Sequence, residues 1–160
     1  MDLQDPELNA EITRSVRDAL DEDIGTGDIT AQLIAADAHC EASIITREDC
    51  VVCGIAWADE VFRQLGNVTT NWHFKDGERA SRNTVIGRLS GNARQILTGE
   101  RTALNFMQLL SGTATQAREF ALLAEHTALK ILDTRKTIPG LRRAQKYAVK
   151  TGGCDNSSSR

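Results

Sequence analysis

The segment "ALKILDTRKTIPGLRRAQKYAVK", residues 128–150, contains the clearest structural signal in the chain. Its first five residues form a short apolar run typical of a buried strand, and residues 140–150 have the apolar spacing of an amphipathic helix. Between them, "DTRKT" places an acid, two hydroxyls and two cations before the Pro139–Gly140 break. A strand, a loop and a helix in this order open an α/β architecture, in which functional groups follow the carboxyl ends of strands.

The charge of the chain is unevenly distributed. Its formal net charge is -3, with nine acids and two bases in residues 1–28. Residues 130–150 instead contain seven bases and one acid, Asp133. A local excess of six positive charges in an acidic protein favours an anionic ligand.

The loop residues have side chains suited to holding an anion. The planar fork of Arg135 would grip a carboxylate or phosphate with two bonds, and Lys136 would add a mobile charge. Thr134 would donate a hydroxyl, and Asp133 would orient a cation or help to hold a divalent ion. By spacing alone, an ordinary solvated loop with surface ion pairs is an equally good interpretation.

The rest of the chain alternates strands and helices before a long helical region. Apolar residues at every fourth position predict a helix over residues 7–21, with Pro6 at its start. Asp28 is expected to cap a turn, and Asp76–Gly77 to form a hairpin turn. The other predicted elements are strands at 40–48, 51–55, 68–74, 83–91 and 128–132, and helices at 56–66, 93–112 (stopped by Gly112), 114–126 and 140–150.

Composition excludes several classes of protein. Hydrophobic residues make up 41% and charged residues 26% of the 160 residues, enough for one domain with a substantial core. No apolar stretch is long enough to cross a membrane, and the acidic N-terminus is unlike a signal peptide, so we expect a cytoplasmic protein. Cys50 and Cys53 lie three apart in a predicted strand and point to opposite faces, which favours buried thiols over a metal site. By pattern alone, Arg101 pairs with its neighbour Glu100.

Two long motifs resemble the quinolinate phosphoribosyltransferase family. They are "LTGERTALNFMQLLSGTAT" at 97–115 and "ILDTRKTIPGLRRAQKYAVKTGG" at 131–153, and they stand in the order of the family. The upstream stretches "ALDEDIGTGDITAQLI", "ASIITRE" and "VVCGIAWADEVF" are also similar to it. The resemblance covers residues 14–156 and is highly specific.

The resemblance implies a fold of two parts. Residues 1–112 would form an α+β N-terminal sandwich domain with a linking helix, and residues 113–156 the first strand-helix unit of an α/β barrel. The barrel would be incomplete in this chain, and residues 157–160 would lie outside the family pattern. That pattern continues after Asn156 with His and Arg, where this chain has Ser157 and Ser158, and Arg160 is out of register.

The resemblance also implies an activity. The family makes nicotinate mononucleotide, pyrophosphate and carbon dioxide from quinolinate and phosphoribosyl pyrophosphate, with Mg²⁺. Thr134, Arg135 and Lys136 would bind substrate, Lys136 would be catalytic, and Arg101 would reach the site of a partner subunit in a homodimer. We expect the chain alone to be inactive, because the family's later lysine and acidic residues are absent. A non-catalytic module that binds anions or nucleic acid, and an assembly partner of the complete enzyme, remain alternatives. Few aromatic residues lie among the cations, so we expect no nucleic-acid partner, and we expect no membrane partner.

Overall fold

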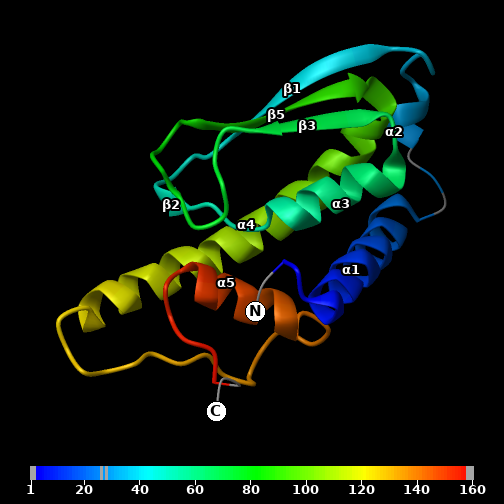
Figure 1. Cartoon of the computed structure of the whole chain (residues 1–160). Coiled ribbons are helices and arrows are strands. Elements are labelled where there is room, and N and C mark those ends of the chain that lie inside the picture. The colour runs from blue at the N-terminus through cyan, green and yellow to red at the C-terminus, as the bar shows by residue number, and fades with distance from the viewer. Residues whose placement is uncertain (1–2, 26, 28, 158–160) are drawn as a thin grey trace.

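The computed structural model describes residues 3–25, 27 and 29–157, and of Ile29 and Thr30 the backbone alone. The predicted cap Asp28 and the positions of Ser158 and Arg160 lie outside the described residues. Figure 1 shows an open sheet on one side of α3 and α4, with α1 and α5 on the other side. The elements are α1 (Pro6–Ile24), α2 (Ile29–Gln32), β1 (His39–Ile45), β2 (Cys50–Val51), α3 (Ile55–Leu65), β3 (Val68–Trp72), β4 (Arg79–Ala80), β5 (Val85–Asn92), α4 (Ala93–Ala124) and α5 (Arg142–Thr151).

The first helix forms as its pattern predicts. Pro6 occupies the first helical turn, and the Asp5 side chain caps the helix by accepting a bond from the Glu7 amide at 3.0 Å. The four apolar residues of the predicted stripe are all buried against the rest of the molecule: Leu8, Ile12, Val16 and Leu20. The prediction of a helix at residues 7–21 is therefore confirmed, and α1 continues to Ile24.

The main sheet is antiparallel, in the order β1-β5-β3. The predicted strands at 40–48, 68–74 and 83–91 are confirmed in this sheet. Of the predicted strand at 51–55, only Val51 lies in a strand, as the second residue of β2, which pairs with β4. Gly54, at φ 105°, turns the backbone into α3, so the helix begins where the strand was expected to continue.

The prediction of a hairpin at Asp76–Gly77 is wrong. The turn joins β3 to β4, and these strands belong to different sheets. The Asp76 carboxylate instead accepts bonds from the Gly54 and Ile55 amides, both at 3.2 Å. It therefore caps α3, a helix distant in sequence, rather than stabilising a local turn.

A single helix, α4, replaces the two helices predicted around Gly112. Its buried stripe runs without interruption from Ile96 past Gly112 to Ala117. A glycine in a helix interior costs only about 1 kcal/mol relative to alanine. Burial of apolar residues on both sides outweighs that cost, so Gly112 does not stop the helix.

Two glycines of α4 provide a matched test of its packing. A Cβ at Gly99 would lie 2.7 Å from Leu65 Cδ1 and 2.8 Å from Phe62 Cε1, whereas one at Gly112 meets nothing within 4 Å. We expect Gly99→Ala to lower the free energy of unfolding by about 1–3 kcal/mol and Gly112→Ala to raise it by about 0.5–1 kcal/mol. Urea titration followed by circular dichroism measures both. Equal effects of the two substitutions would contradict the packing of α4 on α3.

The apolar run at residues 128–132 does not form the predicted strand. Within the described residues it makes one isolated parallel bridge, Leu132 to Asp155. The Asp133 amide donates to the Asp155 carbonyl at 3.0 Å, and the Asp155 amide to the Ile131 carbonyl at 2.9 Å. A strand needs flanking strands to extend, and here only one short segment lies beside it. The following helix is confirmed as α5.

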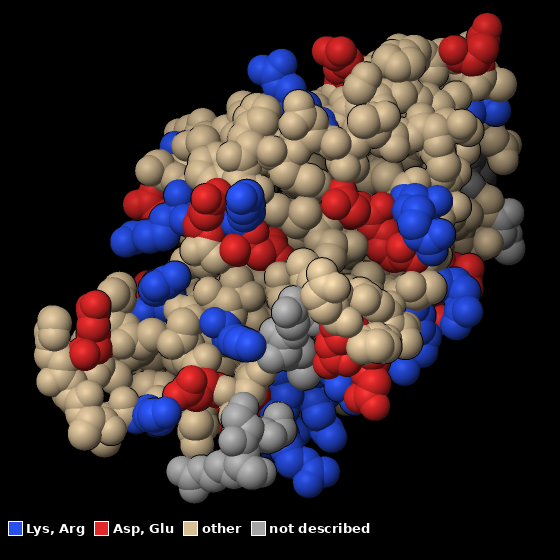
Figure 2. Space-filling view, viewed as in Figure 1, with Lys and Arg blue, Asp and Glu red and all other residues tan. Residues whose placement is uncertain are grey.

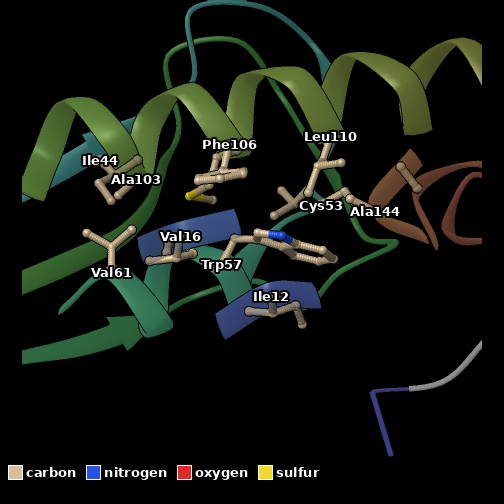
Figure 3. Packing of buried hydrophobic residues seen from close by; sticks show 14 of the residues in the cluster. Ile12, Val16, Ile44, Cys53, Trp57, Val61, Ala103, Phe106, Leu110 and Ala144 are labelled. Carbon is tan, nitrogen blue, oxygen red and sulfur yellow. The ribbon is translucent and has the colours of Figure 1, made fainter. Parts of the chain in front are cut away.

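The core joins α1, α3, α4 and α5 (Figure 3). Figure 3 shows Trp57 of α3 between Ile12 and Val16 of α1 and Phe106 and Leu110 of α4. Trp57 has no exposed surface. The described residues thus form a small α+β fold whose sheets are open, and none of their helices has the length and apolar character needed to span a membrane.

Candidate anion-binding site

The predicted functional loop begins at Asp133, whose side chain is bonded to α5 and to the segment that follows α5. Lys146 of α5 pairs with it at 3.1 Å from Nζ to Oδ2, and the Ser157 amide donates to Oδ1 at 2.8 Å. Burial by itself raises the pKa of Asp133, but the bonds from Ser157 and Lys146 outweigh burial and lower the pKa from its ordinary value. Asp133 is therefore ionised at neutral pH and orients neither Arg135 nor Lys136, the cations that we predicted as its partners.

Thr134 and Lys136 line a cavity of about 500 Å³ between the loop, α4 and α5. We call it the loop cavity. The Lys136 amide donates to the Thr134 hydroxyl at 3.1 Å, which makes a tight local turn. Its wall is partly apolar, with Ala117 and Phe120 of α4, Val149 of α5, and Cys154, which follows α5.

Arg135 lines a second cavity, of about 640 Å³, which we call the basic cavity. It lies between the loop and the N-terminal halves of α1 and α5, and Figure 2 shows cations gathered at this lower end of the molecule. Its charged lining residues are Glu11, Arg14, Arg135, Arg142, Arg143 and Lys146. Two of these five cations pair with carboxylates outside the lining, Lys146 with Asp133 and Arg143 with Glu7. The other three still outnumber Glu11, so the cavity attracts an anion.

The carboxylate of the basic cavity is already engaged. Glu11 is buried and accepts a bond from the Ala144 amide at 2.9 Å, which caps α5. Arg143 pairs with Glu7 at the cavity rim. The side chains of Arg135 and Arg142 make neither a hydrogen bond nor an ion pair with the described residues, so their guanidinium groups are available to a ligand.

Arg101 lies apart from both cavities. Its side chain is 72% exposed and its Nη1 donates to Asp23 of α1 at 2.8 Å. The predicted pairing with Glu100 is wrong, because adjacent residues of a helix do not face each other, whereas the fold places the end of α1 beside Arg101. The structure brings Thr134, Arg135 and Lys136 together on one loop and leaves Arg101 outside the lining of its two cavities.

Sequence reasoning missed three residues of the site. Lys146 is one of the seven bases of residues 130–150, yet its side chain is only 9% exposed and it lines both cavities. Glu11 and Arg14 reach the basic cavity from α1, more than a hundred residues away in sequence. The sequence gives one signal for Lys146, since it stands between the apolar Ala144 and Tyr147 of the buried face.

The described residues offer no evident place for a resident metal ion. No group of three or more His, Cys, Asp or Glu side chains comes together in the described part of the chain. Asp133, the acid of the loop, is committed to Lys146 and Ser157. Cys53 is buried, and burial raises the pKa of its thiol, which keeps it protonated.

Comparisons with known proteins match most of the chain. The model of the quinolinate phosphoribosyl transferase N-terminal domain matches residues 28–111, and that of the C-terminal domain matches residues 113–159. The chain is 46% identical over 133 residues to a probable carboxylating nicotinate-nucleotide pyrophosphorylase of Bacillus subtilis, covering 82% of this chain and 46% of that protein. It is 43% identical over 141 residues to the chloroplastic nicotinate-nucleotide pyrophosphorylase of Arabidopsis thaliana, covering 86% of this chain and 40% of that protein.

Solved structures also match most of this chain, and they match its fold. The nicotinate-nucleotide pyrophosphorylase of Francisella tularensis superimposes with a TM-score of 0.89 at 51% identity, covering 92% of this chain and 53% of the other. The corresponding protein of Ehrlichia chaffeensis gives a TM-score of 0.85 at 39% identity, covering 91% and 54%. The chain therefore spans about half the length of the relatives it matches.

Proposed function

The chain belongs to the quinolinate phosphoribosyltransferase family, and we propose that the whole protein makes nicotinate mononucleotide, pyrophosphate and carbon dioxide from quinolinate and phosphoribosyl pyrophosphate. The observation that supports this most is the loop of Thr134, Arg135 and Lys136, which lies between a cation-rich cavity and a partly apolar one. Quinolinate is an aromatic ring with two carboxylates, and phosphoribosyl pyrophosphate carries several negative charges on its phosphates. The names of the relatives point to the same chemistry.

Each loop residue has a role in this proposal. Arg135 grips a carboxylate of quinolinate with its planar fork, and Thr134 donates a hydroxyl bond. Positive charge develops at C1 of the ribose as pyrophosphate leaves, and the pyridine nitrogen attacks that carbon. Lys136 is the catalytic residue, because its ammonium stabilises the negative charge that develops on the departing pyrophosphate. The ring nitrogen then carries a positive charge, which stabilises the electron pair left on the adjacent ring carbon when its carboxyl group leaves as carbon dioxide. A proton from solvent then binds that carbon in place of the carboxyl group.

Mg²⁺ belongs to this proposal as an ion bound to phosphoribosyl pyrophosphate, where it neutralises phosphate charge. The described residues do not form a carboxylate set that fits it, so we assign it no ligand in this chain. Each role proposed here for the chain is carried by its own cations and hydroxyl.

We further propose the two-part organisation that the family implies. Residues 1–112 form the sandwich domain, and residues 113–156 the first strand-helix unit of the barrel. The whole protein acts in the cytoplasm as a homodimer in which Arg101 enters the site of the partner. The exposure of Arg101, and its absence from the lining of the two cavities, support that role.

We expect the isolated chain to form no measurable nicotinate mononucleotide, although it binds quinolinate. The isolated bridge at Leu132 leaves the loop without the neighbouring strands that would complete a site. Losing one preorganised charged donor commonly costs about 10²- to 10³-fold in rate, and the half of the relatives that this chain does not span would supply several. The assay supplies quinolinate, phosphoribosyl pyrophosphate and Mg²⁺ and follows the product by chromatography, with a full-length relative as the positive control. Turnover near that of the relative would contradict the expectation.

A further inference from the structure

We propose that Lys146 is a positioning residue, which holds Asp133 beneath the loop and thereby sets the direction in which Thr134, Arg135 and Lys136 face their ligand. This inference rests on the proposed function, because it concerns the same loop. It assigns a role to a buried cation that the proposed chemistry leaves unused.

The pair formed by Lys146 and Asp133 is withdrawn from water. The Lys146 ammonium lies 3.1 Å from Oδ2 and 3.2 Å from Oδ1 of Asp133, so it contacts both carboxylate oxygens. The side chains are only 9% and 2% exposed. Although Lys146 lines both cavities, its charge is directed at Asp133. It therefore acts on a ligand through the loop.

Further bonds make Asp133 a junction of three segments. The Ser157 amide donates to Oδ1 at 2.8 Å, and the Asn156 amide nitrogen, in the orientation that satisfies its neighbours, donates to Oδ2 at 2.8 Å and to the Lys146 carbonyl at 3.2 Å. The backbone of Asp133 pairs with that of Asp155. The first residue of the loop is thus fixed to α5 and to residues 155–157 together.

The other end of the loop is also tied to α5. The Ile138 amide donates to the Gln145 side chain at 2.7 Å. Thr134, Arg135 and Lys136 therefore lie between two positions of the loop that are bonded to α5. Their partners, Gln145 and Lys146, are consecutive and belong to one turn of that helix. That turn is itself held in the core, where Ala144 and Ala148 have no exposed surface. A displacement of α5 would therefore move both ends of the loop together.

A purely structural ion pair is the alternative explanation, and the two differ in their consequences. Removing one partner of a buried pair leaves an uncompensated charge, whereas removing the charge of both partners is often nearly neutral for stability. If Lys146 only stabilises the fold, neutralising both charges restores stability, quinolinate affinity and protection of the loop amides. If Lys146 positions the loop, neutralising both charges restores stability, but the loop stays misplaced.

The experiment compares four variants of the chain. Lys146→Met removes the charge, Lys146→Met with Asp133→Asn removes both charges, and Lys146→Arg keeps a cation. Lys150→Met is the matched control, because Lys150 is an exposed lysine one turn further along α5. Urea titration gives stability, calorimetry gives quinolinate affinity, and hydrogen exchange followed by NMR reports protection of the Lys136 and Ile138 amides.

We expect Lys146→Met to weaken quinolinate binding about tenfold, because a loop that is no longer held in place loses part of the charged hydrogen bonding of Arg135. We also expect it to speed exchange of the two loop amides. The double variant should regain stability but neither affinity nor protection, Lys146→Arg should recover part of both, and Lys150→Met should match the unmodified chain. Recovery of affinity and protection in the double variant would overturn the proposal, even if Lys146→Met alone does not fold.

The two proposals fail separately. If the unmodified chain binds no quinolinate, the proposed ligand is wrong for this chain, and loop exchange alone decides whether Lys146 positions the loop. Unchanged exchange at Lys136 and Ile138 in both charge-removing variants would then refute the positioning role.

Discussion

The Arg135→Ala chain will bind quinolinate about 30- to 150-fold more weakly than the unmodified chain. Arg135 lines the basic cavity and its side chain has no partner among the described residues, so its guanidinium is free to meet a carboxylate. Hydrogen bonds to charged groups contribute about 1.5–3 kcal/mol, and a bidentate pair lies toward the upper end of that range. A loss of about 2–3 kcal/mol corresponds to that change in affinity.

Calorimetry with quinolinate as titrant measures this effect. Lys150→Ala is the control, because it removes one positive charge from the exposed face of α5, outside the lining of both cavities. General attraction of an anion to a basic surface would weaken binding equally in both variants and would fall steeply with salt. Equal affinities of the Arg135→Ala and unmodified chains would refute Arg135 as a ligand.

Trp57→Ala will lower the free energy of unfolding by about 3–5 kcal/mol, the range observed when a large buried side chain is truncated. Trp57 is fully buried, and its ring centroid lies 5.6 Å from that of Tyr147 of α5. The substitution leaves a cavity where α1, α3 and α4 meet α5. Domains of this size are stable by only about 5–15 kcal/mol, so the variant approaches the unfolding threshold.

Urea titration followed by far-ultraviolet circular dichroism measures the loss. Leu123→Ala serves as the control, since Leu123 is a large apolar residue of α4 that is 80% exposed. Its truncation should change stability by less than about 0.5 kcal/mol. Similar losses in the two variants would show that Trp57 does not hold the core together.

The same contacts connect the core to the candidate site. The Tyr147 hydroxyl donates to Asp76 at 2.8 Å, and Asp76 caps α3. Burial raises the pKa of Asp76, while the bond from Tyr147 and those from the α3 amides oppose that shift. Tyr147 therefore fixes α5 to the N-terminal part of the chain, and the residue before it, Lys146, holds the loop.

Local pattern was enough to predict much of this protein. Leu8, Ile12, Val16 and Leu20 recur at helical spacing, and the 68–74 run alternates, because nearest neighbours along the chain decide which face of an element is apolar. The family likeness rested on long contiguous motifs and needed no contacts at all. The same motifs singled out Thr134, Arg135 and Lys136 as one group, since three consecutive residues are neighbours in any fold.

Contacts between distant segments settled the rest. Apolar residues are buried on both sides of Gly112, so α4 continues through a residue that by local pattern ends a helix. Residues 128–132 lack neighbouring strands and therefore do not form a strand. The partner of Asp133 is Lys146 rather than an adjacent cation, and Arg14 enters the basic cavity from the other end of the chain. Such pairings depend on how helices pack in three dimensions, because the energy of a buried charge or an apolar face is determined by what surrounds it and not by its sequence neighbours.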